Sequence, residues 1–244
     1  MKISVVIPVL NERASLPATI AALRACHGIA EIIVSDGGST DGTVPWLQAQ
    51  PDIVLVRSMR GKGPQINVGA AAAFDVAGPA DISGIALLIL HADCIISQLA
   101  IDALHAALAD PQLAGGAFYI RFVESRPRSL RLVAWGINVR ARFRNSATGD
   151  QGIFVRKSVF DSIGGAPEWP LFEDVELVRR IKQAGKFRVL RTPVTVSGRR
   201  YIEHGVFRTA LLIYSLRFAY WLGVPPQRLK NWFRDARGKQ KDRS

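Results

Sequence analysis

Short apolar runs alternate with helix-like segments over the first 110 residues, and no other feature constrains the fold as strongly. Each run is almost uninterrupted, which is typical of strands buried on both faces of a sheet. The runs cover residues 2–8, 31–35, 53–57 and 85–90, and the helical segments cover residues 15–25, 44–48, 64–74 and 97–109. This rhythm predicts an α/β fold, with a parallel sheet and helices on both of its faces.

The second half has a less regular pattern. Strands are expected at residues 115–122, 152–155, 187–190 and 194–197, and helices at residues 129–143, 157–163 and 173–184. A long apolar stretch, residues 206–224, precedes a polar and basic end that we expect to fray. The stretch contains two arginines and fails the test for a single membrane-spanning helix.

The positive charge is concentrated in two segments. The chain has 32 Lys and Arg against 20 Asp and Glu, a net charge of +12, yet residues 1–120 carry 6 basic and 10 acidic side chains. Residues 121–144 carry 7 basic and 1 acidic, and residues 195–244 carry 11 and 3. A uniformly basic nucleic-acid binder is disfavoured, because aromatic residues are not interleaved with these basic segments.

The expected compartment is the cytoplasm. Two cysteines, Cys26 and Cys94, cannot build a disulfide framework, and we expect both thiols to be packing residues in a reducing compartment. The N-terminus begins with a strand-like run and has no secretion-signal pattern. Contact of residues 206–244 with the inner face of the membrane, a homodimer interface, or helical packing against the core would explain the basic apolar extension equally well.

Polar clusters follow three of the predicted strands. Asn11 and Glu12 follow the first, a glycine-rich loop from Asp36 to Asp41 follows the second, and His91-Ala92-Asp93 follows the fourth. In sheets of this class, ligands bind at the carboxyl ends of the strands near a switch in strand order. We therefore predict one site formed by these loops.

Each cluster also has a purely structural explanation. The loop after the second strand could be a turn, because Asp-Gly pairs form turns. Arg60 and Lys62 precede a helix and favour phosphate, although a solvated loop is the alternative. Asp93 suits a divalent cation, and His91 could ligate Mn²⁺ or only donate a hydrogen bond.

Glu173 and Asp174 begin a predicted helix. Acidic side chains in a first turn are often only dipole partners. The functional alternative makes one of them a general base that faces an acceptor hydroxyl.

Five motifs in order resemble family 2 glycosyltransferases of the GT-A fold. They are Val6 to Glu12, Ile33 to Thr43, Asn67 to Ala70, His91 to Asp93, and Phe172 to Leu177. The resemblance covers roughly residues 1–200 and implies a GT-A, Rossmann-like, mixed and mainly parallel sheet. It also implies an inverting transfer of a hexose from a nucleoside diphosphate sugar, UDP-linked in preference to GDP-linked, to a hydroxyl.

The resemblance assigns roles to individual residues. It implies that Asp93, with His91, holds Mn²⁺ or Mg²⁺, and that Asp174 is the catalytic base with Glu173 as its neighbour. The implied nucleotide-binding residues are Pro8, Asn11, Glu12, Asp36, Gly38, Asp41, Arg60, Lys62 and Ala92. The implied acceptor-binding residues are Gly149, Asp150, Gln151, Arg199 and Arg200.

Two departures from the family pattern bear on these roles. His91 occupies the position of the first Asp in the usual Asp-x-Asp motif, which bears on how tightly a metal ion binds and on which metal is preferred. The Gln-x-x-Arg-Trp signature of processive synthases is missing, which favours a single, non-processive transfer.

A narrower resemblance points to a bacterial subgroup associated with radical-SAM genes and arsenosugar biosynthesis. It rests on residues 60–70, 90–93, 149–152, 170–174 and 197–201.

The resemblance also suggests a division of the chain. Residues 1–204 would form the GT-A domain, with a nucleotide-binding half to residue 110, and residues 205–244 a helical, basic extension. Two other functions remain open from the sequence. One is a nucleotidyltransferase of similar fold, which usually has a glycine-rich loop after the first strand. The other is a basic membrane-surface protein without catalysis.

Overall fold

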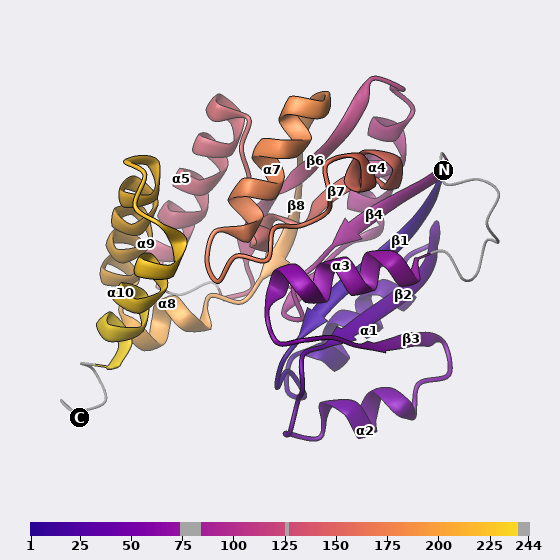
Figure 1. Ribbon diagram of the computed structural model, residues 1–244, viewed down its shortest axis with the longest axis horizontal. Helices are drawn as coiled ribbons and strands as arrows, with labels where there is room; N and C mark the ends of the chain where they lie inside the picture. Colours follow the sequence, from indigo (N-terminus) through magenta and orange to yellow (C-terminus); the bar gives the residue numbers. More distant parts are fainter. Residues whose placement is uncertain (74–83, 125–126, 239–244) are drawn as a thin grey trace.

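The computed structural model describes residues 1–73, 84–124 and 127–238, where eight strands form one mixed sheet in the order β3-β2-β1-β4-β7-β6-β8-β5 (Figure 1). The first-half strands are β1 (Lys2–Val9), β2 (Ile29–Asp36), β3 (Ile53–Arg57) and β4 (Ile85–Ile89). They pair in parallel, as the alternating pattern predicts.

The second-half strands extend this sheet with mixed directions. They are β5 (Cys94–Ile95), β6 (Leu113–Phe122), β7 (Ile153–Arg156) and β8 (Lys186–Val196). β7 is antiparallel to β4 and β6, β8 is parallel to β6, and β5 is antiparallel to β8. The expected mixed, mainly parallel sheet is confirmed.

One strand prediction was wrong. The two short strands expected at residues 187–190 and 194–197 are the single strand β8. Its pairing with β6 is irregular, since Leu190 pairs with Phe118 but Pro193 pairs with Tyr119. The polar interruption in the sequence is thus a local bulge rather than a break between strands.

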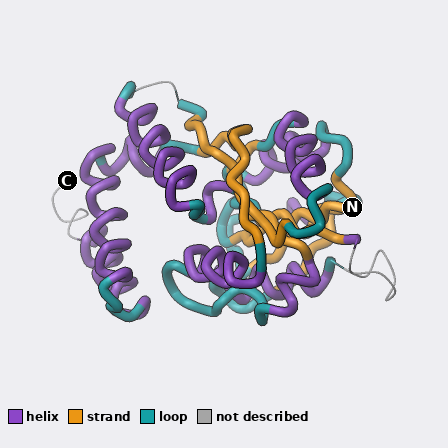
Figure 2. Tube along the Cα trace, turned by 90° about the horizontal axis from the view of Figure 1, so that it is seen from above, coloured by secondary structure: helices purple, strands orange, loops and turns teal. Residues whose placement is uncertain are grey.

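Helices cover both faces of the sheet (Figure 2). They are α1 (Leu16–Arg24), α2 (Thr43–Gln48), α3 (Lys62–Ala72), α4 (Gln98–Leu108), α5 (Ser129–Arg144), α6 (Lys157–Ser162), α7 (Glu173–Ala184), α8 (Arg199–His204), α9 (Val206–Trp221) and α10 (Pro226–Gly238). One buried cluster joins the sheet to α1, α2, α4 and α5, and the other joins it to α3, α6 and α7.

The side chains of β1 show why both faces need a cover. Val5 and Ile7 belong to the first cluster, whereas Val6 between them belongs to the second. Successive side chains of a strand point to opposite faces, so an all-apolar strand must be buried on both sides.

The α9–α10 pair lies at the end of the molecule away from β2 and β3 (Figure 1). Its buried centre consists of Leu216 and Leu229 packed with Phe172, which precedes α7. The end expected to fray began at about Arg228, and this expectation was wrong as far as Gly238, because these residues belong to α10 and Leu229 is fully buried. Residues 239–244 lie outside the described part of the chain.

The order of the strands determines where a ligand-binding crevice lies at the edge of the sheet. β2 and β3 lie on one side of β1, and β4 lies on the other, so the order reverses at β1. The connections that leave the carboxyl ends of β1 and β4 diverge at such a point and leave a crevice. Asn11, Glu12 and the segment His91–Asp93 leave the sheet at this crevice.

Candidate functional site

A cavity of about 660 Å³ lies at this edge of the sheet. Its walls come from the loops after β1 and β4, the first turns of α3 and α7, and the inner faces of α5 and α9. It brings together residues predicted from all parts of the sequence, namely Asn11, Glu12, Lys62, His91, Asp93, Asp150, Glu173, Asp174 and Arg199.

Hydrogen bonds hold the loops after β1 and β2 together. The backbone N–H of Asn11 donates to Ser39 Oγ at 2.8 Å, and the N–H of Thr40 donates to Asn11 Oδ1 at 2.8 Å. Asn11 has φ 57°, a left-handed conformation that asparagine tolerates better than most residues. The N–H of Arg13 donates to Asp41 Oδ2 at 3.0 Å.

The two aspartates of the loop after β2 accept hydrogen bonds from backbone N–H groups. Asp36 is buried, and its Oδ2 accepts from the N–H groups of Gly38 at 2.9 Å and Ser39 at 3.1 Å. The loop after β2 is therefore a turn, as expected from its Asp-Gly pairs. A hydrogen bond from the Thr43 hydroxyl is the main cause that lowers the pKa of Asp41.

Lys62 and His91 meet inside the cavity. Lys62 is the first residue of α3, and Gly61 before it has φ 141°, a conformation that favours glycine. The helix is fixed to the sheet by Gln65, whose Nε2 donates to the carbonyls of Val9 at 2.6 Å and Ser35 at 2.8 Å. Lys62 Nζ lies 3.1 Å from His91 Nε2.

Asp174 is held by a backbone hydrogen bond from another part of the chain. The N–H of Gly149 donates to Asp174 Oδ2 at 2.6 Å, and the N–H of Val175 donates to Oδ1 at 2.7 Å. Gly149 begins the short turn η2 (Gly149–Gln151). A Cβ at Gly149 would lie 2.6 Å from His91 Nε2, so a larger residue would displace the His91 ring.

Glu173, the neighbour of Asp174, is buried. Burial is the main cause that raises the pKa of Glu173 to about 7, and the negative charge of Asp174 adds to it, whereas Lys62 opposes it. The two adjacent carboxyl groups thus differ in environment, which is the condition under which neighbouring acids take different roles.

The predicted acceptor residues fall into different environments. Asp150 lines the cavity, whereas Gln151 is fully buried and its Nε2 donates to Phe118 O at 3.0 Å. Arg199 is exposed and forms an ion pair with Glu203 at 2.5 Å. Arg200 lies on α8, but its side chain is outside the described part of the structure.

Six predicted nucleotide-binding residues do not line the cavity. Pro8, Asp36 and Ala92 are buried, and Gly38, Asp41 and Arg60 are exposed. Ala92 contributes its carbonyl, which accepts from the buried Thr19 hydroxyl at 2.7 Å.

Sequence reasoning missed two arginines that line the cavity, Arg140 on α5 and Arg217 on α9. Both lie in segments whose basic character was noticed, but periodicity did not show which basic side chains turn inward. The available signal was the presence of two arginines, Arg208 and Arg217, inside the apolar stretch 206–224.

Among the described residues, no group of three or more His, Cys, Asp and Glu side chains is arranged to hold a metal ion. Cys94 is fully buried, and burial raises the pKa of its thiol well above the ordinary range. This agrees with the packing role expected for it.

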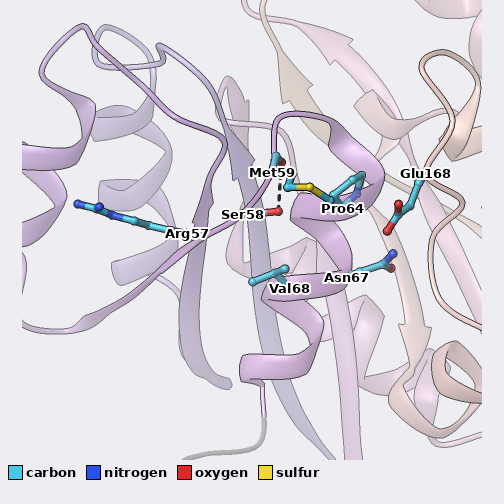
Figure 3. Close-up of a pocket in the computed structure, with 7 residues that line it drawn as sticks. All are labelled: Arg57, Ser58, Met59, Pro64, Asn67, Val68 and Glu168. Carbon is cyan, nitrogen blue, oxygen red and sulfur yellow. Dashed lines mark hydrogen bonds between the residues drawn. The ribbon is translucent and has the colours of Figure 1, made fainter.

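A second depression, of about 470 Å³, lies on the outer side of α3 between Arg57 and Glu168 (Figure 3). Arg57 extends away from the other labelled side chains (Figure 3). Asn67 Nδ2 donates to Ala166 O at 2.9 Å and thus joins two segments of the chain. None of the predicted site residues lines this depression, so we do not assign it a function.

The comparison with protein families gives one match. The model described as "Glycosyl transferase family 2" matches residues 4–164. No curated protein matches the chain significantly.

Solved structures of glycosyltransferases share the fold. S. aureus TarS 1–349 has a TM-score of 0.62 and 17% identity over 81% of this chain and 60% of that one. The mannosyltransferase PcManGT from Pyrobaculum calidifontis, in complex with GDP-Man and Mn²⁺, has a TM-score of 0.61 and 21% identity over 94% of this chain and 67% of that one. The chain spans only 37% of the longer TarS chain.

Replacing Glu173 by Gln should remove a pH-dependent loss of stability. Because the folded state raises the pKa of Glu173 from 4.5 to about 7, it holds a proton that the unfolded state has released between these values. The wild type should therefore lose stability as pH rises from 5 to 8, by up to about 3 kcal/mol. Thermal melts over this range should show a smaller decline for Glu173→Gln.

The matched control is Glu176→Gln on the same helix. Hydrogen bonds from Arg179 lower the pKa of Glu176, so its contribution has the opposite sign and is lost only as pH falls. This variant should keep the decline of the wild type. Equal declines in wild type and Glu173→Gln would contradict the assignment.

Proposed function

The chain belongs to glycosyltransferase family 2, and we propose that it transfers a single hexose from a nucleoside diphosphate sugar to an acceptor hydroxyl with inversion. UDP is preferred to GDP in this proposal. The observation that carries it is the position of Asp174, which the N–H of Gly149 holds in the same cavity as Lys62 and Asp93. The family match argues against the nucleotidyltransferase alternative.

The donor half of the proposed site comes from the first 110 residues. The joined loops of Asn11 and Asp41 form the rim for the nucleoside, and Asp36 fixes the backbone of that rim. Lys62, at the N-terminus of α3, is the cation of this chain that faces the diphosphate. His91 orients it through the contact between Nε2 and Nζ.

Asp174 is the proposed general base. It takes the proton of the acceptor hydroxyl, and the oxygen attacks the anomeric carbon on the side opposite the diphosphate. The bond between that carbon and the diphosphate oxygen breaks, and the nucleoside diphosphate leaves with the electron pair. Stabilising this leaving group is the main electrostatic task, which we assign to Lys62. The hydrogen bond from Gly149 fixes the direction in which Asp174 points.

The residues present fit a divalent cation held mainly by the protein's Asp93. Mg²⁺ and Mn²⁺ commonly bind through one or two carboxylates and complete their shell with phosphate oxygens and water. Asp93 is exposed within the cavity, and Asp150 also lines it. His91 fits a ligand role less well, because Lys62 already contacts its Nε2. When bound, the cation would supply Lewis-acid stabilisation of the diphosphate.

The proposal also includes the division of the chain and the narrower relationship. Residues 1–110 would bind the donor, residues 111–204 the acceptor, and residues 205–244 would close the cavity through α9. Gly149, Asp150, Arg199 and Arg200 remain the proposed acceptor residues, with Gln151 behind them.

The radical-SAM-associated, arsenosugar-type subgroup remains our proposed assignment, supported by segments 90–93, 149–152 and 170–174, which converge on this cavity.

The outer face of α9 supports contact with a membrane surface. Phe207, Leu211, Phe218, Trp221 and Leu222 are each 60–74% exposed and lie at helical spacing on this face, which we call the α9 stripe. No helix in the described residues is long and apolar enough to cross a bilayer. Exposed basic residues accompany the stripe, including Arg208, Arg228 and Lys230. We propose that it lies on the anionic, cytoplasmic face of a bilayer.

Asp174→Asn should lower kcat by about 10²–10⁴-fold, the usual contribution of a general base. The amide keeps the shape of the side chain, so the Kd of the nucleotide sugar should change little. Steady-state transfer assays and calorimetry measure the two quantities. Asp52→Asn, at the exposed ion pair with Arg24, is the matched control and should leave both unchanged. Near-normal turnover by Asp174→Asn would disprove the assignment.

The double variant Phe218→Ser/Trp221→Ser tests the α9 stripe. The rings of Phe218 and Trp221 stack with their centroids 6.0 Å apart and should contribute together to bilayer binding. Wild type should co-sediment with phosphatidylglycerol vesicles but weakly with phosphatidylcholine, and the double variant should bind at least about tenfold more weakly. Leu99→Ser, which changes an exposed apolar residue on α4, is the control. Absence of wild-type binding, or loss of a dimer in the double variant, would overturn this proposal.

A further inference from the structure

Two arginines from different helices face the same cavity as Asp174. Arg140 comes from α5 and Arg217 from α9, and these helices pack against each other (Figure 1). Neither arginine forms an ion pair within the described residues. Two guanidinium groups that share a partly enclosed cavity without direct contact to a carboxylate are costly, so their presence needs an explanation.

Arg140 is fixed in place but incompletely hydrogen-bonded. Its Nη2 donates to Gln151 Oε1 at 3.1 Å. Gln151 is itself fully buried, and its Oε1 also accepts from the N–H of Thr148 at 3.1 Å. The Nε of Arg140 is buried and has no hydrogen-bond partner. Buried donors without partners are rare, and a binding site is one of the recognised reasons for them.

Arg217 experiences the charge of Arg140. Burial is the main cause that lowers the pKa of Arg217 to about 10, and Arg140 lowers it further, whereas Asp174 and Asp150 oppose these effects. Arg217 is therefore electrostatically coupled to the proposed base. An anion bound between the two arginines would relieve their repulsion and would lie near Asp174.

Apolar side chains accompany each arginine on its own helix, and Asp150 and Asp174 line the same cavity. Val133 and Ile137 line the cavity from the same face of α5 as Arg140, at positions seven and three residues earlier. Ile213 and Ala210 line it from the same side of α9 as Arg217, four and seven residues earlier. A small group with a negative charge and an apolar body fits this arrangement, because each guanidinium can form a bidentate pair with phosphate or carboxylate.

We propose that Arg140 and Arg217 form a subsite for an anionic group, a phosphate or a carboxylate, carried by the acceptor. This inference rests on the proposed function, since it places that group beside the hydroxyl that Asp174 would deprotonate. The acceptor is favoured over the donor because both arginines belong to the second half, whereas Asn11, Lys62 and Asp93 belong to the first. Gln151 is then a positioning residue for Arg140 rather than an acceptor contact.

Phenyl phosphate is a suitable probe because it combines a phosphate with an apolar ring. Calorimetry with saturating UDP, which occupies the donor site, should show binding to the full-length wild type. Arg140→Gln and Arg217→Gln should each raise the Kd of phenyl phosphate at least about tenfold, the loss expected for a charge-assisted hydrogen bond. Arg217→Lys, which retains the charge, should show an intermediate Kd.

Arg208→Gln is the matched control, since Arg208 is exposed on the same helix and should not affect the probe. The Kd of UDP should be unchanged in all variants. Arg217→Gln should also melt at a higher temperature than wild type without ligand, because it removes a desolvated charge. This gain shows that the variant folds.

The outcomes separate this inference from the proposed function. An unchanged Kd of phenyl phosphate in both variants, or an equal loss of UDP binding, would overturn the acceptor subsite. Absence of UDP binding, with probe binding still lost in Arg217→Gln, would refute glycosyl transfer from UDP-sugars and leave the anion subsite intact.

Discussion

The hydrogen bond from the N–H of Gly149 to Asp174 joins the parts of the chain on which the site depends. It connects the turn before β7 to the first turn of α7, and glycine at position 149 leaves room for the His91 ring that follows β4. Three segments distant in sequence are thus fixed at one point. The sheet supplies the frame, since β4 and β7 are neighbours and carry His91 and Gly149 at their adjoining ends.

The first half of the fold could be predicted because its signals are local. β3 and α7 begin and end where the pattern places them, and the parallel pairing of β1 to β4 follows from the strand–helix rhythm. The bulge in β8 could not be predicted, because it depends on β6, far along the chain. A helical extension was expected over residues 205–244, but the burial of Leu229 in α10 could not be predicted, because it depends on the distant Phe172 as well as on α9.

The candidate site was predictable in part, for the same physical reason. Side chains that directly follow buried strands, such as Asn11 and Asp93, or that begin a helix, such as Asp174, reach the cavity because the fold fixes these positions. Arg140 and Arg217 reach it from the middles of helices, where orientation depends on tertiary packing. Gln65 and Gln151 act through backbone carbonyls and neighbouring side chains, which no spacing in the sequence indicates.

The structure also gives the positive charge two different locations. Arg140 and Arg217 line the cavity, whereas Arg208, Arg228 and Lys230 are exposed. α9 thus carries Arg217 at the cavity, and its exposed side chains include Arg208 and the aromatic rings of Phe218 and Trp221. The helix therefore links the proposed acceptor subsite to the proposed membrane contact.

The most direct test of the central claim is the melting temperature of the protein with a panel of UDP- and GDP-sugars, with and without Mn²⁺. A ligand that binds only the folded state must stabilise it, by about 2.7 kcal/mol at 100 times its Kd. For a chain of this size the account predicts a rise of roughly 5–10 °C with a UDP-sugar. No rise with any nucleotide sugar, in either condition, would contradict it.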